Sequence, residues 1–342
     1  MKKYLAYIRG HHQILGFEEF QAALEAEEVV YNNTKIDDQI SVFTTKDNPL
    51  PAARRCAFLH SLLGLIITGS IQENKLEIQK LESNFSIEKN SSFCVRAKRI
   101  GKKEIKQKST EIERKLGEYI LDRYDGYDLR VDFKNPDNRF IVIIIKNEFY
   151  LGKELWSKDR KQYHSREPSN RPNFRPGSMK TDFARALVNL SCVRKGEIFL
   201  DPFCGSGGIL IEASHLGANC IGIDIDYNAV VSSMKNLRAF GESFYTILLC
   251  DSRHMTIKNA HAIATDPPYS IQSSTHGKQV VDLILEFLEE AETILLPGRR
   301  LVFSSPSKLH PENLIENTKF KIISQIDTRI HKSLTRRILV VK

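Results

Sequence analysis

The chain has 342 residues, of which 41% are hydrophobic and 27% are charged, and its formal net charge is +8. A chain of this length and apolar content is expected to fold into two or three domains with sizeable cores, which excludes an intrinsically disordered protein. The excess of lysine and arginine fits either a polyanionic partner or an ordinary basic surface, so charge alone leaves the partner open.

The cysteines and the start of the chain exclude further classes of protein. None of the six cysteines forms a Cys-x-x-Cys pair and the ten histidines show no ligand spacing, so no metal site is expected. Most of the cysteines stand in apolar runs typical of buried, reduced thiols, which favours a cytoplasmic protein. Met1–Gly10 lacks the apolar stretch of a signal peptide, and no apolar run is long enough to cross a bilayer.

The first 50 residues have the pattern of a small α/β unit. Tyr4–Arg9 and Ser41–Thr45 read as short strands, and Phe17–Ala26 has the spacing of an amphipathic helix. Pro49 and Pro51 then interrupt the chain. We therefore expect a first unit over residues 1–50.

A second unit is expected over residues 51–155. Arg54–Ile67 is apolar and predicts a helix, and Thr110–Asp122 predicts another. Three strands are predicted, at Ser92–Arg99, Leu129–Phe133 and Phe140–Ile145. A turn-rich segment at residues 135–138 separates the last two strands and favours a hairpin.

The segment Tyr163–Gly177 marks the boundary between the two halves of the chain. Its prolines, arginines and asparagines give it the composition of a linker, which we place over residues 156–176. This linker is expected either to be solvated or to contact a polyanion. From residue 177 to residue 342 helices and strands alternate, and such β–α units predict a doubly wound, Rossmann-like α/β domain. Ligands of such a domain bind at the carboxyl ends of the strands.

A glycine-rich turn follows the first strand of this domain. In Asp201-Pro202-Phe203-Cys204-Gly205-Ser206-Gly207-Gly208 a strand ends and a helix begins at once. Glycines at such a turn let the backbone approach a ligand closely. The third glycine of the dinucleotide fingerprint is replaced by Leu210, and no Gly-Lys-Ser/Thr phosphate loop is present. The turn therefore favours a nucleoside ligand without a pyrophosphate, the alternative being a tight turn that binds nothing.

Acidic residues stand at the ends of the next two strands. Asp224 is placed to accept the hydroxyls of a ribose, whereas Asp226 suits the N-cap of the following helix. Asp251 ends the third strand and could accept a hydrogen bond from an adenine amino group. Together with Asp201, these residues place an acid at three successive strand ends. A single acid there is often a helix cap, but three in succession are a much less likely coincidence.

The fourth strand ends in Asp266-Pro267-Pro268-Tyr269. The prolines lack N–H donors and stiffen the turn, so that backbone carbonyls can face a ligand. Asp266 supplies a hydrogen-bond acceptor, and Tyr269 supplies a flat face on which an extruded base can stack. The alternative is a rigid turn with an exposed tyrosine.

The two motifs together resemble those of class I amino-methyltransferases, which use S-adenosyl-L-methionine to methylate exocyclic base amines. The segment Phe93–Lys102 resembles a THUMP domain, and the unit before it resembles a ferredoxin-like fold. Their order, together with Phe174–Met179, resembles the archaeal tRNA guanosine-10 N2-methyltransferases over nearly the whole chain. The Asp at position 266 resembles the guanine-N2 branch, because relatives acting on adenine or cytosine amines usually carry Asn there.

The resemblance implies roles for individual residues. The catalytic set would be Asp266, Pro267, Pro268 and Tyr269. The cofactor S-adenosyl-L-methionine would be bound by Asp201, Phe203, Gly205, Gly207, Asp224, Ile225, Asp251, Ser252, Gly177 and Thr181. The tRNA would be contacted by Arg96, Lys98, Arg99, Lys102 and Lys103, although a solvated basic face is the alternative. No membrane partner is implied, and a monomer is expected, with an accessory subunit left open.

Two rival functions remain at this point. The first is methylation of a different guanosine, in tRNA or ribosomal RNA, and the second is an RNA-binding module whose catalytic domain is inactive. The intact glycine turn and the Asp-Pro-Pro-Tyr segment argue against the second. A THUMP-containing thiolation enzyme is excluded because the chain has neither a phosphate loop nor a catalytic cysteine pair.

Overall fold

The computed structural model describes residues 1–342 except 38, 73–74, 82–86, 102–106, 269–273 and 332–333. The chain forms two compact units. Unit 1 comprises residues 1–13, 29–54 and 59–158, and unit 2 comprises residues 14–28, 55–58 and 159–342.

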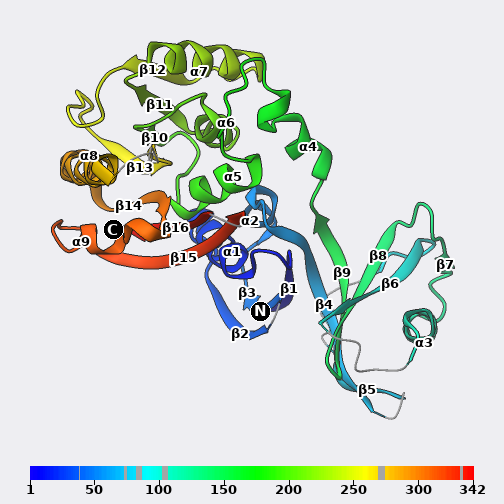
Figure 1. Ribbon diagram of the computed structural model, residues 1–342. Helices are drawn as coiled ribbons and strands as arrows, with labels where there is room; N and C mark the ends of the chain where they lie inside the picture. Colours follow the sequence, from blue (N-terminus) through cyan, green and yellow to red (C-terminus); the bar gives the residue numbers. More distant parts are fainter. Residues whose placement is uncertain (38, 73–74, 82–86, 102–106, 269–273, 332–333) are drawn as a thin grey trace. The chain divides into compact units, whose positions relative to one another are not determined.

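Unit 1 is built on one mixed sheet with the strand order β2-β3-β1-β4-β9-β8-β6-β7, and β5 pairs with β4 (Figure 1). Its strands are β1 Lys2–Ile8, β2 Tyr31–Asp37, β3 Ile40–Thr45, β4 Leu59–Gln72, β5 Lys75–Leu81, β6 Ser92–Ile100, β7 Arg130–Val131, β8 Asn138–Ile145 and β9 Glu148–Ser157. Because β1 pairs with β4, this sheet crosses the division expected at residue 50. That division, like the other expected domain bounds, stays a proposal.

The predicted helix at Arg54–Ile67 is wrong. A short helix, α2 (Leu50–Arg55), ends there, and most of the segment belongs to strand β4. Both faces of β4 are buried, so its apolar residues run on continuously and show no alternation. Periodicity cannot separate such a strand from a buried helix.

Strand β6 carries an alternating pattern that the sequence predicted correctly. Phe93, Val95 and, at its edge, Ala97 join a buried cluster that helix α3 (Ser109–Arg123) completes with Ile112 and Leu116. The intervening side chains of β6 point to the opposite face. The predicted hairpin of the two later strands is wrong, since β7 and β8 both pair in parallel with β6.

Unit 2 contains a Rossmann-like sheet with the order β12-β11-β10-β13-β14-β16-β15. The strands are β10 Ile198–Asp201, β11 Asn219–Asp224, β12 Tyr245–Leu249, β13 Ala260–Thr265, β14 Leu295–Pro306, β15 Ile322–His331 and β16 Leu334–Val341. The first five are parallel, and β16 is antiparallel to both its neighbours. The predicted doubly wound, mostly parallel sheet is therefore confirmed.

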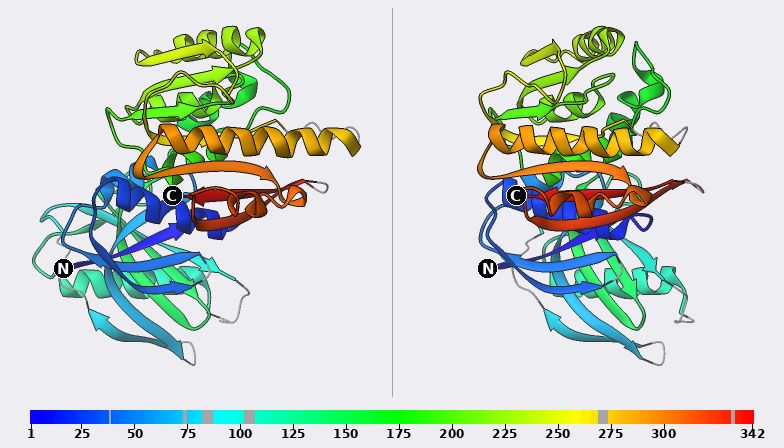
Figure 2. Two further views of the ribbon diagram at one scale, coloured as in Figure 1. Left: turned by 90° about the vertical axis from the view of Figure 1, so that its left-hand side faces the viewer. Right: turned by 60° about the vertical axis from the view of Figure 1, so that its left-hand side comes forward.

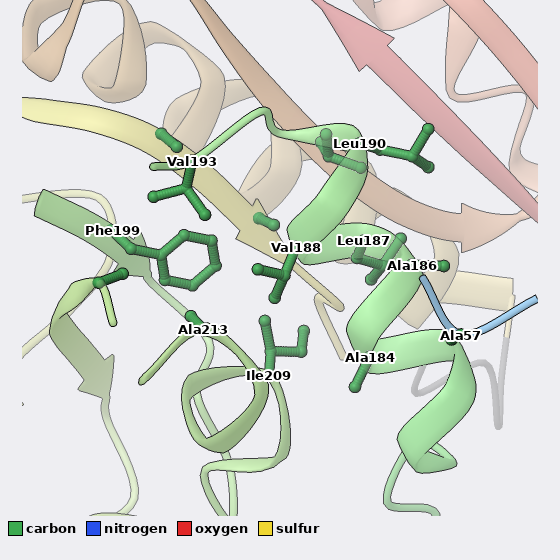
Figure 3. Packing of buried hydrophobic residues seen from close by; sticks show 14 of the residues in the cluster. Ala57, Ala184, Ala186, Leu187, Val188, Leu190, Val193, Phe199, Ile209 and Ala213 are labelled. Atoms are coloured by element: carbon green, nitrogen blue, oxygen red, sulfur yellow. The ribbon is translucent and has the colours of Figure 1, made fainter. Parts of the chain in front are cut away.

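Helices cover both faces of this sheet. They are α1 Gln13–Ala26, α4 Arg160–Ser165, α5 Thr181–Leu190, α6 Gly208–Ser214, α7 Tyr227–Ala239, α8 Ser274–Ile294 and α9 Glu312–Ile315. On one face Val188 of α5 and Ile209 of α6 pack with Phe199 of β10 (Figure 3). On the other face the long helix α8, seen along its length in Figure 2, buries Phe287 and Leu288 against β13 and β14.

Helix α1 belongs to unit 2 although it precedes almost all of unit 1 in the sequence. Leu15, Ala22 and Ala26 of α1 join the same buried cluster as α5. The linking segment at residues 55–58 lies in this unit too, and Ala57 and Phe58 enter the cluster. The second domain is thus not one continuous stretch of chain. Within the described part of the chain, no helix has the length and apolarity that a membrane span requires.

Candidate functional site

The carboxyl ends of four neighbouring strands meet at one cavity in unit 2. Because β12, β11, β10 and β13 are parallel and adjacent, the residues that follow them share one edge of the sheet. The cavity has a volume of about 530 Å³, within the range of small-molecule sites. Its walls include Asp201, Asp224, Asp251 and Asp266, one acid from each strand end.

The glycine turn forms the floor of the cavity between β10 and α6. Gly205 adopts φ +52° and its N–H donates to Asp224 Oδ2 at 2.8 Å. Gly207 adopts φ +81°, and a Cβ there would lie 2.6 Å from Ser233 Oγ. Only glycine therefore fits at position 207. Gly207 itself is not among the lining residues, because it faces Ser233 of α7.

Asp226 occupies the N-cap position that the sequence suggested, and Asp224 lies at the cavity. Asp224 lines the cavity, and its Oδ1 accepts a hydrogen bond from the N–H of Asp226 at 2.9 Å. Asp226 caps helix α7 by accepting from the N–H of Asn228 at 2.8 Å. It also pairs with Arg175 at 2.7 Å, and this arginine holds the pKa of Asp226 below its usual value. Asp226 and Arg175 thereby fix one rim of the cavity.

Asp251 is held by an arginine that the sequence reasoning missed. The guanidinium of Arg253 donates to both carboxylate oxygens, with Nη2–Oδ2 at 2.7 Å. This contact lowers the pKa of Asp251 to about 2, so the residue is an anion at neutral pH. Arg253 also pairs with Glu286 and lines the cavity. The Asp-x-Arg spacing at a strand end is the one signal that could have revealed it.

Asp201 is the most deeply buried acid of the site. Its Oδ1 accepts from Thr265 Oγ1 at 2.7 Å and from the N–H of Phe203 at 3.3 Å. Its Oδ2 has no hydrogen-bond donor among the described residues. Burial raises the pKa of Asp201 to about 7, and the nearby Asp224 and Asp266 add to the shift. An acceptor in this state favours a cationic or hydrogen-bonding ligand group.

Asp266 extends from the end of β13 toward the same cavity. Arg336 of β16 pairs with its Oδ2 at 3.1 Å, and Ser304 of β14 donates to its Oδ1. Burial raises the pKa of Asp266 to about 6, and Arg336 and Ser304 limit the rise. Pro268 lines the cavity and Pro267 does not, since its ring is buried. Tyr269 lies outside the described residues.

The expected linker is a wall of the site, which corrects the expectation of a solvated segment. Arg171, Arg175 and the residues 176–179 line the cavity. Arg171 is only 4% exposed, and its Nη1 and Nη2 have no hydrogen-bond acceptor among the described residues. Burial lowers the pKa of Arg171. Such a guanidinium suits a carboxylate ligand.

An ion cluster around Glu212 explains why Arg166 of this segment is buried. Glu212 of α6 is fully buried and accepts from Arg166 Nε at 2.6 Å and from Arg185 Nε at 2.7 Å. Burial opposes the ionisation of Glu212, but these arginines hold its pKa below the usual value. Arg166, which stands in the segment expected to be solvated or to contact a polyanion, is therefore buried by its ion pair with Glu212.

The remaining predicted cofactor residues divide between the cavity and its surroundings. Phe203, Ile225, Ser252 and Gly177 line the cavity. Thr181 does not, because it is fully buried in the first turn of α5.

The predicted RNA contacts lie in unit 1, on β6. Arg96 and Lys98 are exposed on the face opposite α3, and the guanidinium of Arg96 lies 4.8 Å from the centre of the Phe133 ring. Arg99 instead donates to the backbone carbonyl of Gln107 and to Ser109 Oγ, so it holds the chain before α3. Lys102 and Lys103 lie outside the described residues.

Comparison with family models gives two matches. Residues 168–337 match the model described as an RMKL-like methyltransferase domain, and residues 70–154 match the THUMP domain. A tRNA (guanine(10)-N2)-dimethyltransferase of Methanothermobacter thermautotrophicus is 34% identical over 84% of both chains. One of Methanocaldococcus jannaschii is 28% identical over 98% of both chains.

Two solved structures share the fold. TrmN from Thermus thermophilus has a TM-score of 0.55 at 21% identity, covering 99% of both chains. SMU.472, solved in complex with SAH, has a TM-score of 0.55 at 14% identity, covering 99% of this chain and 98% of that one. At these identities the likeness concerns the fold alone.

Proposed function

The chain belongs to the family of tRNA (guanine(10)-N2)-dimethyltransferases, and from this premise we propose that it methylates the exocyclic N2 amine of guanosine 10 in tRNA, with S-adenosyl-L-methionine as the methyl donor. The reaction would take place in the cytoplasm. The single observation that carries the proposal is that Asp266 and the glycine turn at Gly205 line one cavity.

The residues of the cavity fit the proposed donor. S-adenosyl-L-methionine carries a carboxylate, an ammonium group, a sulfonium centre and an adenosine. Arg171 Nη1 and Nη2 and Asp201 Oδ2 have no hydrogen-bond partner in the described part of the chain. They supply a buried cation and a buried acceptor, which suit the two charged ends of an amino acid. Gly205, at positive φ, leaves room for the ligand to approach the backbone.

We assign the parts of the donor to the strand ends accordingly. Asp201 and Arg171 would hold the methionine moiety, Asp224 the ribose, and Asp251 the adenine amino group. Ile225 is 70% exposed beside Asp224 and would contact the adenine ring. When bound, the donor supplies an electrophilic methyl group on its sulfonium.

The remaining chemistry belongs to the protein. The lone pair of the guanine amine is delocalised into the ring, so the nitrogen is a weak nucleophile. With a pKa of about 6, Asp266 is ionised at neutral pH and can accept hydrogen bonds from the amine. The carbonyl of Pro267 would accept the second amine hydrogen. Together these acceptors would orient the nitrogen and stabilise the positive charge that develops on it. Asp266 would then take up the released proton, directly or through water.

A nucleoside assay tests the proposal. The purified chain is incubated with the donor and a transcript of tRNA, and the nucleosides are identified by tandem mass spectrometry. Methylated guanosine should form and map to position 10, and its mass counts one or two methyl groups. A transcript with inosine at position 10 lacks the amine and should stay unmodified. Methylation at another guanosine would favour the rival assignment.

The variant Asp266→Asn should lose activity by a factor of about 10² or more, because a neutral amide gives up the charge that stabilises the developing cation. Binding of the donor, measured by calorimetry, should change little. Asp282→Asn, at an exposed position of α8, is the matched control and should keep full activity. Near-normal turnover of Asp266→Asn would overturn the role of Asp266.

A further inference from the structure

The carboxylate of Asp266 is held by two residues that do not line the cavity. Arg336 Nη2 lies 3.1 Å from Oδ2, and Ser304 Oγ donates to Oδ1. Asp266 lines the cavity, whereas Arg336 and Ser304 are not among its described lining residues. Each carboxylate oxygen therefore has a donor outside the cavity lining. A carboxylate oxygen can accept more than one hydrogen bond, so both keep acceptor capacity for a ligand in the cavity.

Three neighbouring strands bring these groups together. Thr265, directly before Asp266, pairs with Phe303, directly before Ser304. On the next strand Arg336 pairs with Pro306. Ser304 is fully buried and Arg336 is only 8% exposed. The buried guanidinium of Arg336 lies beside the carboxylate of Asp266 and stabilises its anionic form.

Groups from three strands act on the ionisation of Asp266. Arg336 from β16 stabilises its anionic form, as does the hydroxyl of Ser304 from β14. Asp201 from β10 acts in the opposite sense, because the two acids repel each other electrostatically. Burial also favours the neutral form. Without the arginine, the carboxyl groups of Asp201 and Asp266 would face one cavity with no cation from β16, and the pKa of Asp266 would rise further. A protonated Asp266 presents a donor in place of an acceptor to the substrate amine.

We propose that Arg336 and Ser304 are positioning residues that keep Asp266 ionised and turn its free lone pairs toward the substrate amine. The inference rests on the proposed function for its consequence in catalysis, but the effect of Arg336 on the ionisation of Asp266 can be measured without any turnover. An arginine is suited to this task because its guanidinium stays protonated when buried.

The first experiment is a titration that needs no activity. The protein is labelled with ¹³C at the aspartate carboxyls, and the signal of Asp266 is identified by its loss in Asp266→Asn. In wild type its pKa should lie near 6. In Arg336→Gln it should rise by about one unit or more, and Arg336→Lys should restore most of the difference. Arg329→Gln, at an exposed position of the same hairpin, is the matched control.

The second experiment follows kcat with pH at saturating tRNA and donor. A rise of about one unit in the pKa of Asp266, from about 6, lowers its ionised fraction at pH 6.5 roughly threefold, so the kcat of Arg336→Gln should be lower by about that factor at pH 6.5 and should recover at pH 8.5. Ser304→Ala should shift the acid limb in the same direction by less. Thermal melting and donor affinity show that each variant is folded.

The outcomes separate the two proposals. If the wild-type protein were inactive but titrated as expected, the proposed function would be refuted, while the proposal that Arg336 and Ser304 keep Asp266 ionised would be supported. An active wild type whose Arg336→Gln variant titrates like wild type, or loses rate equally at every pH, would show that Arg336 has a structural role only.

Discussion

A buried glutamate in helix α1 provides a sharp test of how unit 2 is held together. Glu19 is fully buried, and its carboxylate accepts hydrogen bonds from the N–H groups of Ala57 and Phe58, both at 2.7 Å, and from Asn189 Nδ2 at 2.8 Å. Asn189 belongs to α5, so one side chain joins three separated segments of the chain. We expect Glu19→Ala to destabilise the packing of α1, α5 and the segment at residues 57–58.

The size of the effect follows from these contacts. A hydrogen bond to a charged group is worth about 1.5–3 kcal/mol, so three independent bonds would sum to several times that. The loss is smaller because water can enter the vacated space and because the cost of burying the carboxylate disappears as well. Breaking a buried charged network typically costs about 3–5 kcal/mol, and this is the destabilisation we expect.

Hydrogen exchange is the suitable assay, because a single unfolding free energy is poorly defined for a chain with two units. Amides of α1 and α5 should exchange roughly 10² to 5 × 10³ times faster in Glu19→Ala than in wild type, which is the destabilisation of about 3–5 kcal/mol converted to a rate ratio. Glu18→Ala, at a half-buried neighbouring position of the same helix, is the control. If both variants exchanged alike, or if only α1 became faster, the reasoning about a shared anchor would be refuted.

Further predictions concern the charges of the two units. Asp201→Asn should raise the melting temperature of the free protein at pH 8. The pKa of Asp201 is raised from 3.8 to about 7, so above pH 7 the folded protein must bury the carboxylate as an anion, which lowers its stability. The rise in melting temperature caused by Asp201→Asn should therefore become smaller as the pH falls from 7 toward 4. Calorimetry should show weaker donor binding by the same variant. Neutralising Arg96 and Lys98 together with glutamine should weaken tRNA binding and reduce its salt dependence by about 0.7–0.9 per lost phosphate contact, whereas Arg114→Gln, on α3, should not. Unchanged tRNA affinity in filter binding would remove these two residues from the RNA surface.

The cavity could be predicted from sequence because its defining residues are local features. Asp201, Asp224 and Asp251 each follow or end an apolar strand, and a parallel sheet places such positions at one edge whatever the loops between them do. Gly205, which lines the cavity, could likewise be recognised from the turn between strand and helix. These inferences need no knowledge of contacts between distant segments.

The features that sequence reasoning missed depend on distant partners. Arg171 lies in a segment with linker composition, and its burial follows from packing against Gly208 and from the charge of Glu212 on α6. Arg336 stands near the end of the chain, and its pairing with Asp266, 70 positions earlier, cannot be inferred from a local sequence pattern. Helix α1 was predicted as a helix, but no local pattern indicates that it packs in unit 2.

The groups around the cavity have one electrostatic property in common. Burial disfavours the charged forms of Asp201, Asp266 and Arg171, so each is costly to keep ionised without a partner. Asp266 has a permanent partner in Arg336, and its charge is thereby kept ready for a neutral substrate amine. Asp201 Oδ2 and the end nitrogens of Arg171 have no hydrogen-bond partner among the described residues. A zwitterionic ligand would supply both missing partners, so the free energy stored in these two charges would contribute to its binding. Asp266 thus has a counter-ion from the protein because the substrate amine is uncharged, whereas Asp201 and Arg171 obtain theirs from the charged ligand.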